Sequence, residues 1–139
     1  MKNLVKIKGD ASFRNFFRKK KDHHTSIIVI AKKDKFKNLL VYDAINKILN
    51  KNKILAPGLY KQKYSKNYIE IQDFGNQTIL KKLNNKKNEE FFYFKKIIRL
   101  LIKIQSIKNR KIKNFQNKIY TIPKYDKKIL IKETNLFCD

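Results

Sequence analysis

The chain has 139 residues, with 31 Lys and 4 Arg against 11 acidic residues, so its formal net charge is +24 and its length predicts one domain or part of one. A hydrophobic fraction of 42% excludes general disorder, and no apolar run approaches the ~20 residues of a membrane span or the length of a signal peptide. The single cysteine, Cys138, excludes an internal disulfide and a Cys-based zinc site, and these features together predict a cytoplasmic protein.

The high positive charge has two interpretations. A charge of this size normally indicates nucleic acid or an anionic membrane as a partner. Lys, Asn and Ile are also the residues that AT-rich codons encode, and they fill 66 of the 139 positions. Arg, whose planar fork reads phosphate and guanine, is scarce. The composition therefore favours a solvated lysine-rich surface with non-specific polyanion binding at low salt, and a dedicated nucleic-acid-binding module is the alternative.

The first third of the chain alternates apolar and polar residues with the period of two that is typical of β-strands. The alternation predicts strands over 4–8 and 13–19, and the β-branched run 26–31 predicts a third strand buried on both faces. Turn residues at 9–12 and a polar loop at 19–24 separate them. Such short connections predict an antiparallel meander.

A helix is predicted over 35–50, where apolar residues spaced by four form two adjacent rows. The rows are Leu40, Ala44 and Ile48, and Val41, Ile45 and Leu49. A turn at 56–58 then precedes a second hairpin predicted over 59–63 and 67–73.

The remainder of the chain is predicted to be helical. A short helix is expected over 77–83, a long one from the N-cap Asn88 to about residue 107, and a last one from the N-cap Asp126 to about residue 136. The segment 109–121 between them is predicted to be basic and irregular.

This order of elements predicts an α+β fold. Three strands, a helix, two strands and then helices resemble the small lobe of protein-kinase-like phosphotransferases, a five-stranded antiparallel sheet with one helix after the third strand. Residues 1–74 would form that lobe, and residues 75–139 the hinge and the first helices of an incomplete large lobe.

Four stretches of the chain resemble signatures of the aminoglycoside-phosphotransferase-like kinases. Residues 9–18, GDASFRNFFR, resemble the GDASFRRYFR signature of the subgroup that phosphorylates N-acetylmuramate and N-acetylglucosamine at the anomeric hydroxyl. Residues 54–57, ILAP, and 69–78, IEIQDFGNQT, resemble two further segments in the expected order. Residues 122–133, IPKYDKKILIKE, resemble the segment that precedes the large lobe's catalytic part.

The resemblance implies an ATP-dependent sugar kinase that uses Mg²⁺. Its nucleotide-binding residues would be those of a phosphate-covering hairpin and of an adenine-binding hinge. These residues are Gly9, Asp10, Ala11, Ser12, Phe13 and Arg14 in the hairpin, and Gln72, Asp73 and Phe74 in the hinge. Small residues in such a turn allow backbone N–H groups to approach phosphate oxygens, and an ordinary hairpin turn is the alternative.

Two positions depart from a typical kinase pattern. The third strand carries no lysine, so Lys32 just after it, facing Asp43 on the helix, is the candidate phosphate ligand, and a surface lysine is the alternative. Asp73-Phe74-Gly75 spells a metal-binding triplet of protein kinases, but no His-x-Asp loop precedes it, so Asp73 is interpreted as the end of the fifth strand. His23 and His24 are interpreted as a solvated loop, since two adjacent histidines make a poor metal cage.

The resemblance places the family's catalytic loop and Mg²⁺ ligands after the point that corresponds to Asp139. We therefore expect no catalytic residue and no Mg²⁺ ligand in this chain, and no kinase activity from it alone. The sequence leaves three hypotheses: a sugar-kinase fragment, a basic nucleic-acid-binding module, and a non-catalytic pseudokinase lobe that binds nucleotide or a partner chain.

Overall fold

The fold combines a five-stranded sheet, a two-stranded hairpin and four α-helices in a computed structural model that describes residues 4–7, 14–22, 24–35, 37–85, 89–123 and 126–135. The strands are β1 (Leu4–Ile7), β2 (Arg14–Lys21), β3 (His24–Ala31), β4 (Leu59–Lys63), β5 (Tyr68–Gln72), β6 (Lys111–Lys113) and β7 (Ile119–Thr121). The helices are α1 (Asn38–Lys51), α2 (Ile79–Asn85), α3 (Glu90–Gln105) and α4 (Lys127–Thr134), with short 3₁₀ turns η1 (Lys33–Lys35) and η2 (Tyr64–Lys66).

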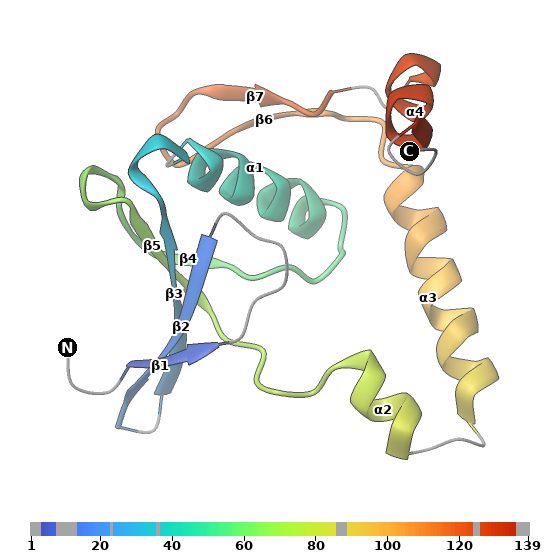
Figure 1. Cartoon of the computed structure of the whole chain (residues 1–139), viewed down its shortest axis with the longest axis horizontal. Helices are drawn as coiled ribbons and strands as arrows, with labels where there is room; N and C mark the ends of the chain where they lie inside the picture. Colours follow the sequence, from blue (N-terminus) through green and yellow to red (C-terminus); the bar gives the residue numbers. More distant parts are fainter. Residues whose placement is uncertain are drawn as a thin grey trace.

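The large sheet is antiparallel throughout and has the strand order β1-β2-β3-β5-β4. Strands β1 to β3 form a meander, α1 follows β3, and β5 returns beside β3 with β4 at the edge (Figure 1). The prediction of a five-stranded antiparallel sheet with one helix after the third strand is therefore confirmed.

The core lies between one face of this sheet and α1. Alternate residues of β3 and β5, among them Val29 and Ile69, point to that face and are fully buried, and Leu39 of α1 packs on them. Of the predicted helix stripe, Ala44 and Ile48 are buried as expected, but Leu40 is only half-buried. The apolar stripe is broad, so its spacing indicates an amphipathic helix without choosing which residue lies at its centre.

Two predicted loops are strands in the structure. The segment predicted as a loop at 19–24 is mostly part of β2 and β3, because Asp22 adopts a left-handed conformation with φ of 51° and allows a tight turn. The segment predicted as irregular at 109–121 forms the β6–β7 hairpin. Its turn is closed by Asn114, whose side chain accepts hydrogen bonds from two backbone N–H groups, and by Asn117 at φ of 58°.

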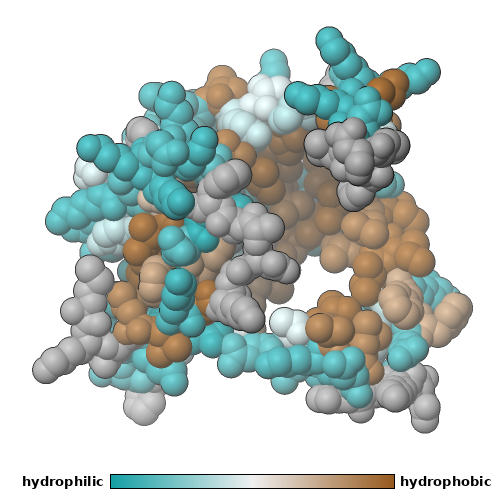
Figure 2. Space-filling model, in the orientation of Figure 1, coloured by the Kyte–Doolittle hydropathy of each residue, from teal (hydrophilic) through white to brown (hydrophobic). Residues whose placement is uncertain are grey.

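The helical remainder has a largely exposed apolar surface. Eight large apolar side chains of α3 are exposed, and Figure 2 shows apolar side chains gathered over this helix. The predicted N-cap Asp126 is confirmed, since its side chain accepts a hydrogen bond from the Ile129 N–H. Helix α3 begins at Glu90 after Glu89, and the predicted N-cap Asn88 lies outside the described residues. None of the helices in the described ranges is long and apolar enough to cross a membrane.

Candidate functional site

A groove of about 340 Å³ lies where the inner face of the sheet meets the segment after β5. We name it the hinge groove. Its apolar wall comes from β1, β2, β3 and β5, and its polar end from the segment 72–76. The lining residues are Ile7, Phe16, Arg18, Ile27, Tyr42, Pro57, Ile71, Gln72, Asp73, Phe74, Gly75, Asn76, Thr78 and Lys81. A pocket of this size, mostly apolar with a few polar groups, is typical of a small-molecule site.

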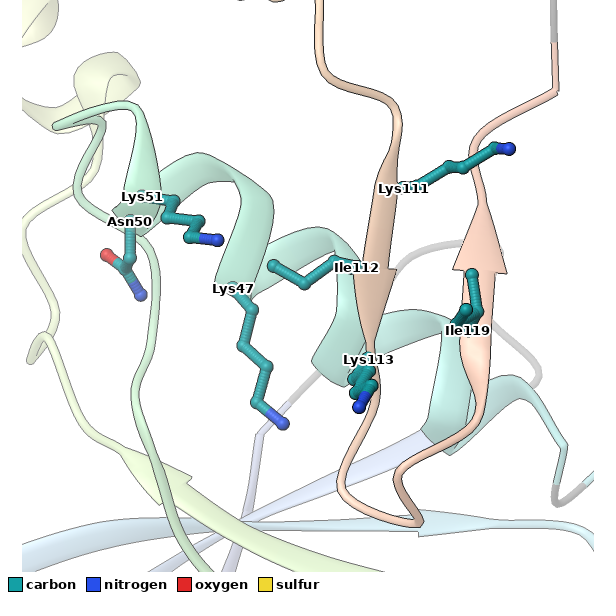
Figure 3. Close-up of a pocket in the computed structure, with 7 residues that line it drawn as sticks. All are labelled: Lys47, Asn50, Lys51, Lys111, Ile112, Lys113 and Ile119. Atoms are coloured by element: carbon teal, nitrogen blue, oxygen red, sulfur yellow. The ribbon is translucent and has the colours of Figure 1, made fainter.

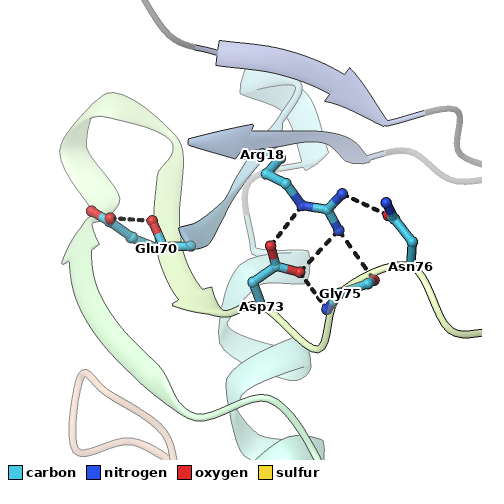
Figure 4. Close-up of polar contacts among 6 residues, drawn as sticks. Arg18, Glu70, Asp73, Gly75 and Asn76 are labelled. Carbon is cyan, nitrogen blue, oxygen red and sulfur yellow. Dashed lines mark hydrogen bonds and ion pairs between the residues drawn. The ribbon is translucent and has the colours of Figure 1, made fainter. Parts of the chain in front are cut away.

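Arg18 joins β2 to the hinge at one end of the groove (Figure 4). Its Nε donates to Asp73 Oδ2 at 2.6 Å, and its Nη2 donates to Asp73 Oδ1 at 3.0 Å. The same guanidinium donates to Asn76 Oδ1 at 2.6 Å and to the Gly75 carbonyl at 3.1 Å. Asp73 also accepts from the Gly75 N–H at 2.8 Å, so the hinge is held in one conformation.

The electrostatics of this pair stabilise its charged state. The hydrogen bond from Arg18, helped by the Gly75 N–H, holds the pKa of Asp73 below its ordinary value although burial opposes the shift. The hydrogen bond to Asp73 correspondingly raises the pKa of Arg18. The Asp73 carboxylate, directly after the end of β5, is thus paired with a guanidinium.

Arg14 lies toward the opposite end of the groove. Its guanidinium carbon stacks 4.8 Å from the centre of the Tyr42 ring, a cation–π contact between β2 and α1. Burial raises the pKa of Tyr42, although a hydrogen bond with Asn46 works in the other direction. Arg14 pairs with Ala31 across the sheet and directly follows the segment 8–13. A positive charge therefore borders the groove on the side of the predicted phosphate-covering hairpin.

Side chains of α1 hold the turn at 56–58 in place beside the hinge. Asn50 donates to the Ala56 carbonyl at 2.9 Å and accepts from the Ala56 N–H at 3.0 Å, while Asn46 donates to the Pro57 carbonyl at 3.1 Å. The Gln72 N–H donates to the Gly58 carbonyl at 2.9 Å. These bonds attach the turn at 56–58 to both the helix and β5.

The hinge groove combines an apolar wall with a stretch of open backbone at its edge. Ile7, Phe16 and Ile71 provide an apolar wall, and Phe74 is 46% exposed at its edge. Within the described part of the chain, neither the N–H nor the C=O of Phe74 has a hydrogen-bond partner. The backbone at Phe74 therefore offers one hydrogen-bond donor and one acceptor side by side to a small molecule.

The structure brings only some of the predicted site residues together. Gln72, Asp73 and Phe74 line the hinge groove, and Arg14 borders it. Residues 9–13 lie outside the described residues, as does His23. Lys32 directly follows the end of β3, is exposed, and is not among the residues that line the groove. Asp43, the expected partner of Lys32, instead pairs with Lys47 at 2.8 Å.

The hinge clamp by Arg18 was not among the predicted site residues. The sequence did contain a signal for it, because only 4 of the 35 basic residues are Arg and two of these are in β2. In a chain so biased toward Lys, an Arg in a sheet strand is a candidate for a planar fork or a stacked guanidinium. Both Arg14 and Arg18 make such contacts.

A second polar cluster lies on the other face of the sheet. Ser26 donates to Glu70 Oε1 at 2.6 Å, and Lys19 Nζ lies 3.1 Å from the same oxygen. Burial opposes ionisation of Glu70, but the hydrogen bonds from Ser26 and Lys19 outweigh it, and the pKa of Glu70 falls below its ordinary value. This cluster joins β2, β3 and β5, and it has no access to the hinge groove.

No model of a known protein family matches the chain, and a search of curated proteins likewise finds no match. Across the residues that the structure describes, no group of three or more His, Cys, Asp and Glu side chains is placed to hold a metal ion.

Proposed function

We propose that this chain is the nucleotide-binding part of an ATP-dependent phosphotransferase of the aminoglycoside-phosphotransferase-like class. The observation that carries the proposal is the hinge groove, which has an apolar wall, the unpaired backbone of Phe74, and Tyr42, on whose ring Arg14 stacks. Adenine would lie against Ile7 and Ile71, and the phosphates would extend toward Arg14 and the hairpin that contains Gly9.

The antiparallel sheet supports this arrangement because the segment before β2 and the segment after β5 lie at opposite ends of it. The segment 8–13 connects β1 to β2 at the end of the sheet where Arg14 pairs with Ala31. The hinge leaves β5 at the opposite end, where Gln72 pairs with Ser26. A nucleotide lying along the groove would thus contact the hinge with its base and the hairpin with its phosphates.

The helices after the hinge support the proposal that the chain belongs to a larger two-lobed enzyme. Exposed Phe91, Phe94, Ile98, Leu101 and Ile102 of α3 give that helix an apolar surface of the kind that packs inside a helical lobe. Such a lobe would supply the base for the sugar hydroxyl and the Mg²⁺ ligands. The resemblance of residues 9–18 favours an amino sugar as substrate, and the use of ATP favours a cytoplasmic location.

Competition binding tests the proposal with a control for charge. A chain of +24 attracts any polyphosphate, so affinity for ATP alone decides nothing. We expect a fluorescent ATP analogue, measured near about 150 mM salt, to be displaced by ATP and by adenosine, and much less by GTP or tripolyphosphate.

A matched pair of variants locates the site. Phe74 and Phe94 are 46% and 50% exposed, but only Phe74 lines the groove. Phe74→Ala is expected to weaken ATP binding roughly 2- to 10-fold through lost contact with the base, whereas Phe94→Ala leaves it unchanged. Equal displacement by ATP, GTP and tripolyphosphate, with no difference between the two variants, would refute the proposed function.

A further inference from the structure

A basic groove of about 680 Å³ lies between α1 and the β6–β7 hairpin. Lys47 and Lys51 line it from α1, and Lys111 and Lys113 line it from β6. Ile112 points from β6 toward the helix, whereas the Lys111 side chain extends from β6 over β7 (Figure 3). Ile119 of β7 completes its apolar surface. The lining contains no acidic residue.

Lysine is concentrated in this groove beyond its abundance in the chain. Four of the seven lining residues are Lys, compared with 31 of 139 residues overall. The hinge groove has fourteen lining residues, of which only Arg18 and Lys81 are basic. Codon bias accounts for lysines dispersed over a surface, whereas these four come from two separate elements that border one concavity.

The wall that presents these lysines is rigid. Asn114, which is 5% exposed, closes the hairpin turn by accepting hydrogen bonds from the N–H groups of Gln116 and Lys118 at 2.9 and 3.2 Å. The Phe115 ring meets the Tyr64 ring edge-on at 5.6 Å between centres. The backbone of β6, which carries Lys111 and Lys113, is therefore held in place relative to the rest of the fold.

The charges of the groove are not all equivalent. Lys47 lies 2.8 Å from the carboxylate of Asp43, which is almost fully buried, so that pair has little net charge. Lys51, Lys111 and Lys113 provide the remaining positive field, and all three residues are exposed.

A neighbouring groove adds aromatic rings. It has a volume of about 540 Å³, shares Ile119 with the basic groove, and is lined by Tyr64 and Tyr120 together with Lys37 and Lys118. Amines that follow a phosphate backbone, combined with aromatic rings on which bases stack, are the features with which proteins bind single-stranded nucleic acid.

We propose that the basic groove binds the phosphodiester backbone of single-stranded nucleic acid, with bases against Tyr64 and Tyr120 of the neighbouring groove. A duplex is too wide and stiff to place its bases in such a concavity, and a flat membrane surface would meet only its rim. This binding is independent of the nucleotide proposed for the hinge groove, because the two grooves share no residue.

Two charge-matched triple variants test the site. Lys51→Gln, Lys111→Gln and Lys113→Gln change the groove, while Lys20→Gln, Lys21→Gln and Lys132→Gln change exposed lysines elsewhere, and each set lowers the formal charge of +24 by three. The probes are fluorescein-labelled oligouridylate and oligothymidylate of equal length, followed by anisotropy over a range of salt concentrations. A urea denaturation of each variant confirms that it is folded.

The groove triple is expected to lower oligonucleotide affinity roughly tenfold or more and to reduce the slope of log K against log salt by about 2. The control triple is expected to change the affinity less than about threefold. Tyr120→Leu in the wild-type background is expected to weaken binding of the oligonucleotides but not of inorganic polyphosphate, since only the oligonucleotides have bases to stack.

Equal weakening by both triples would show that binding follows net charge alone and would overturn the proposal. So would an unchanged oligonucleotide affinity in the Tyr120→Leu variant, or tighter binding of duplex RNA than of the single strands. The groove triple leaves the adenosine competition at the hinge unchanged, so failure of this proposal and failure of the proposed function are distinguishable.

Discussion

Arg18 on β2 and Asp73 after β5 are joined by two parallel hydrogen bonds, from Nε to Oδ2 at 2.6 Å and from Nη2 to Oδ1 at 3.0 Å. The side chains are 16% and 3% exposed, so the pair is largely shielded from water. Since β3 lies between β2 and β5 in the sheet, this contact crosses β3 and ties the hinge to β2.

The first prediction concerns the two hydrogen bonds between Arg18 and Asp73. Arg18→Lys keeps the charge but loses the planar arrangement that lets one side chain bond both carboxylate oxygens, Asn76 and Gly75 together. We expect the free energy of unfolding to fall by about 1–3 kcal/mol, measured by urea denaturation. Arg99→Lys on the exposed surface of α3 is the control and should stay within about 0.5 kcal/mol of wild type. Equal effects of the two substitutions would contradict the prediction.

The second prediction is a pH dependence. In the folded protein the pKa values of Asp73 and Glu70 lie below their ordinary values of 3.8 and 4.5. Groups with lowered folded pKa values bind protons more readily when unfolded, so their stabilisation is present above those ordinary values and is lost as pH falls through the folded ones. Unfolding free energies at a series of pH values should show Asp73→Asn less stable than wild type near neutrality, with the difference shrinking below about pH 4. A constant difference down to about pH 2.5 would exclude this linkage.

The third prediction concerns the packing of α1. Leu39 is fully buried between the helix and the sheet, whereas Leu55 is 78% exposed. Leu39→Ala is expected to destabilise the protein by about 2–5 kcal/mol, because it removes contacts and leaves a cavity. Leu55→Ala should change stability by less than about 0.5 kcal/mol. Similar urea midpoints for the two variants would be inconsistent with the helix lying on this face of the sheet.

The sequence predicted the elements whose pattern is local and strong. Ser26 to Ala31 is an almost uninterrupted apolar β-branched run, and its neighbours in the sheet alternate apolar and polar residues with a period of two. These patterns predicted the three-stranded meander. The β6–β7 hairpin was not predicted, because each strand has only three residues and neither is strongly apolar. Its stability comes from contacts that sequence spacing does not show, such as Phe115 against Tyr64.

The residues of the candidate sites also separate into those that the sequence predicted and those that it did not. Gln72 to Phe74 were found from a motif that is continuous in sequence, and they line the hinge groove. The partner of Asp73 comes from a strand 55 residues earlier, and the basic groove joins residues of α1 to residues of β6. A single sequence contains no direct signal for such pairings, although the rarity of Arg against 31 Lys did mark Arg18 as unusual.

The last prediction is that the purified 139-residue chain binds ATP but does not phosphorylate N-acetylmuramate or N-acetylglucosamine. Transfer to a sugar hydroxyl needs a carboxylate base and carboxylates that hold Mg²⁺. Three carboxylates that are at least partly buried already have cationic partners, since Asp73 pairs with Arg18, Glu70 with Lys19 and Asp43 with Lys47. Sugar-dependent ADP release should therefore not exceed that of a reaction without protein. The Phe74→Ala variant guards against a contaminating kinase, because activity that belongs to this chain would fall with its ATP affinity and contaminant activity would not. Sugar-dependent ADP release that decreases in that variant would show that the chain itself holds a complete catalytic site.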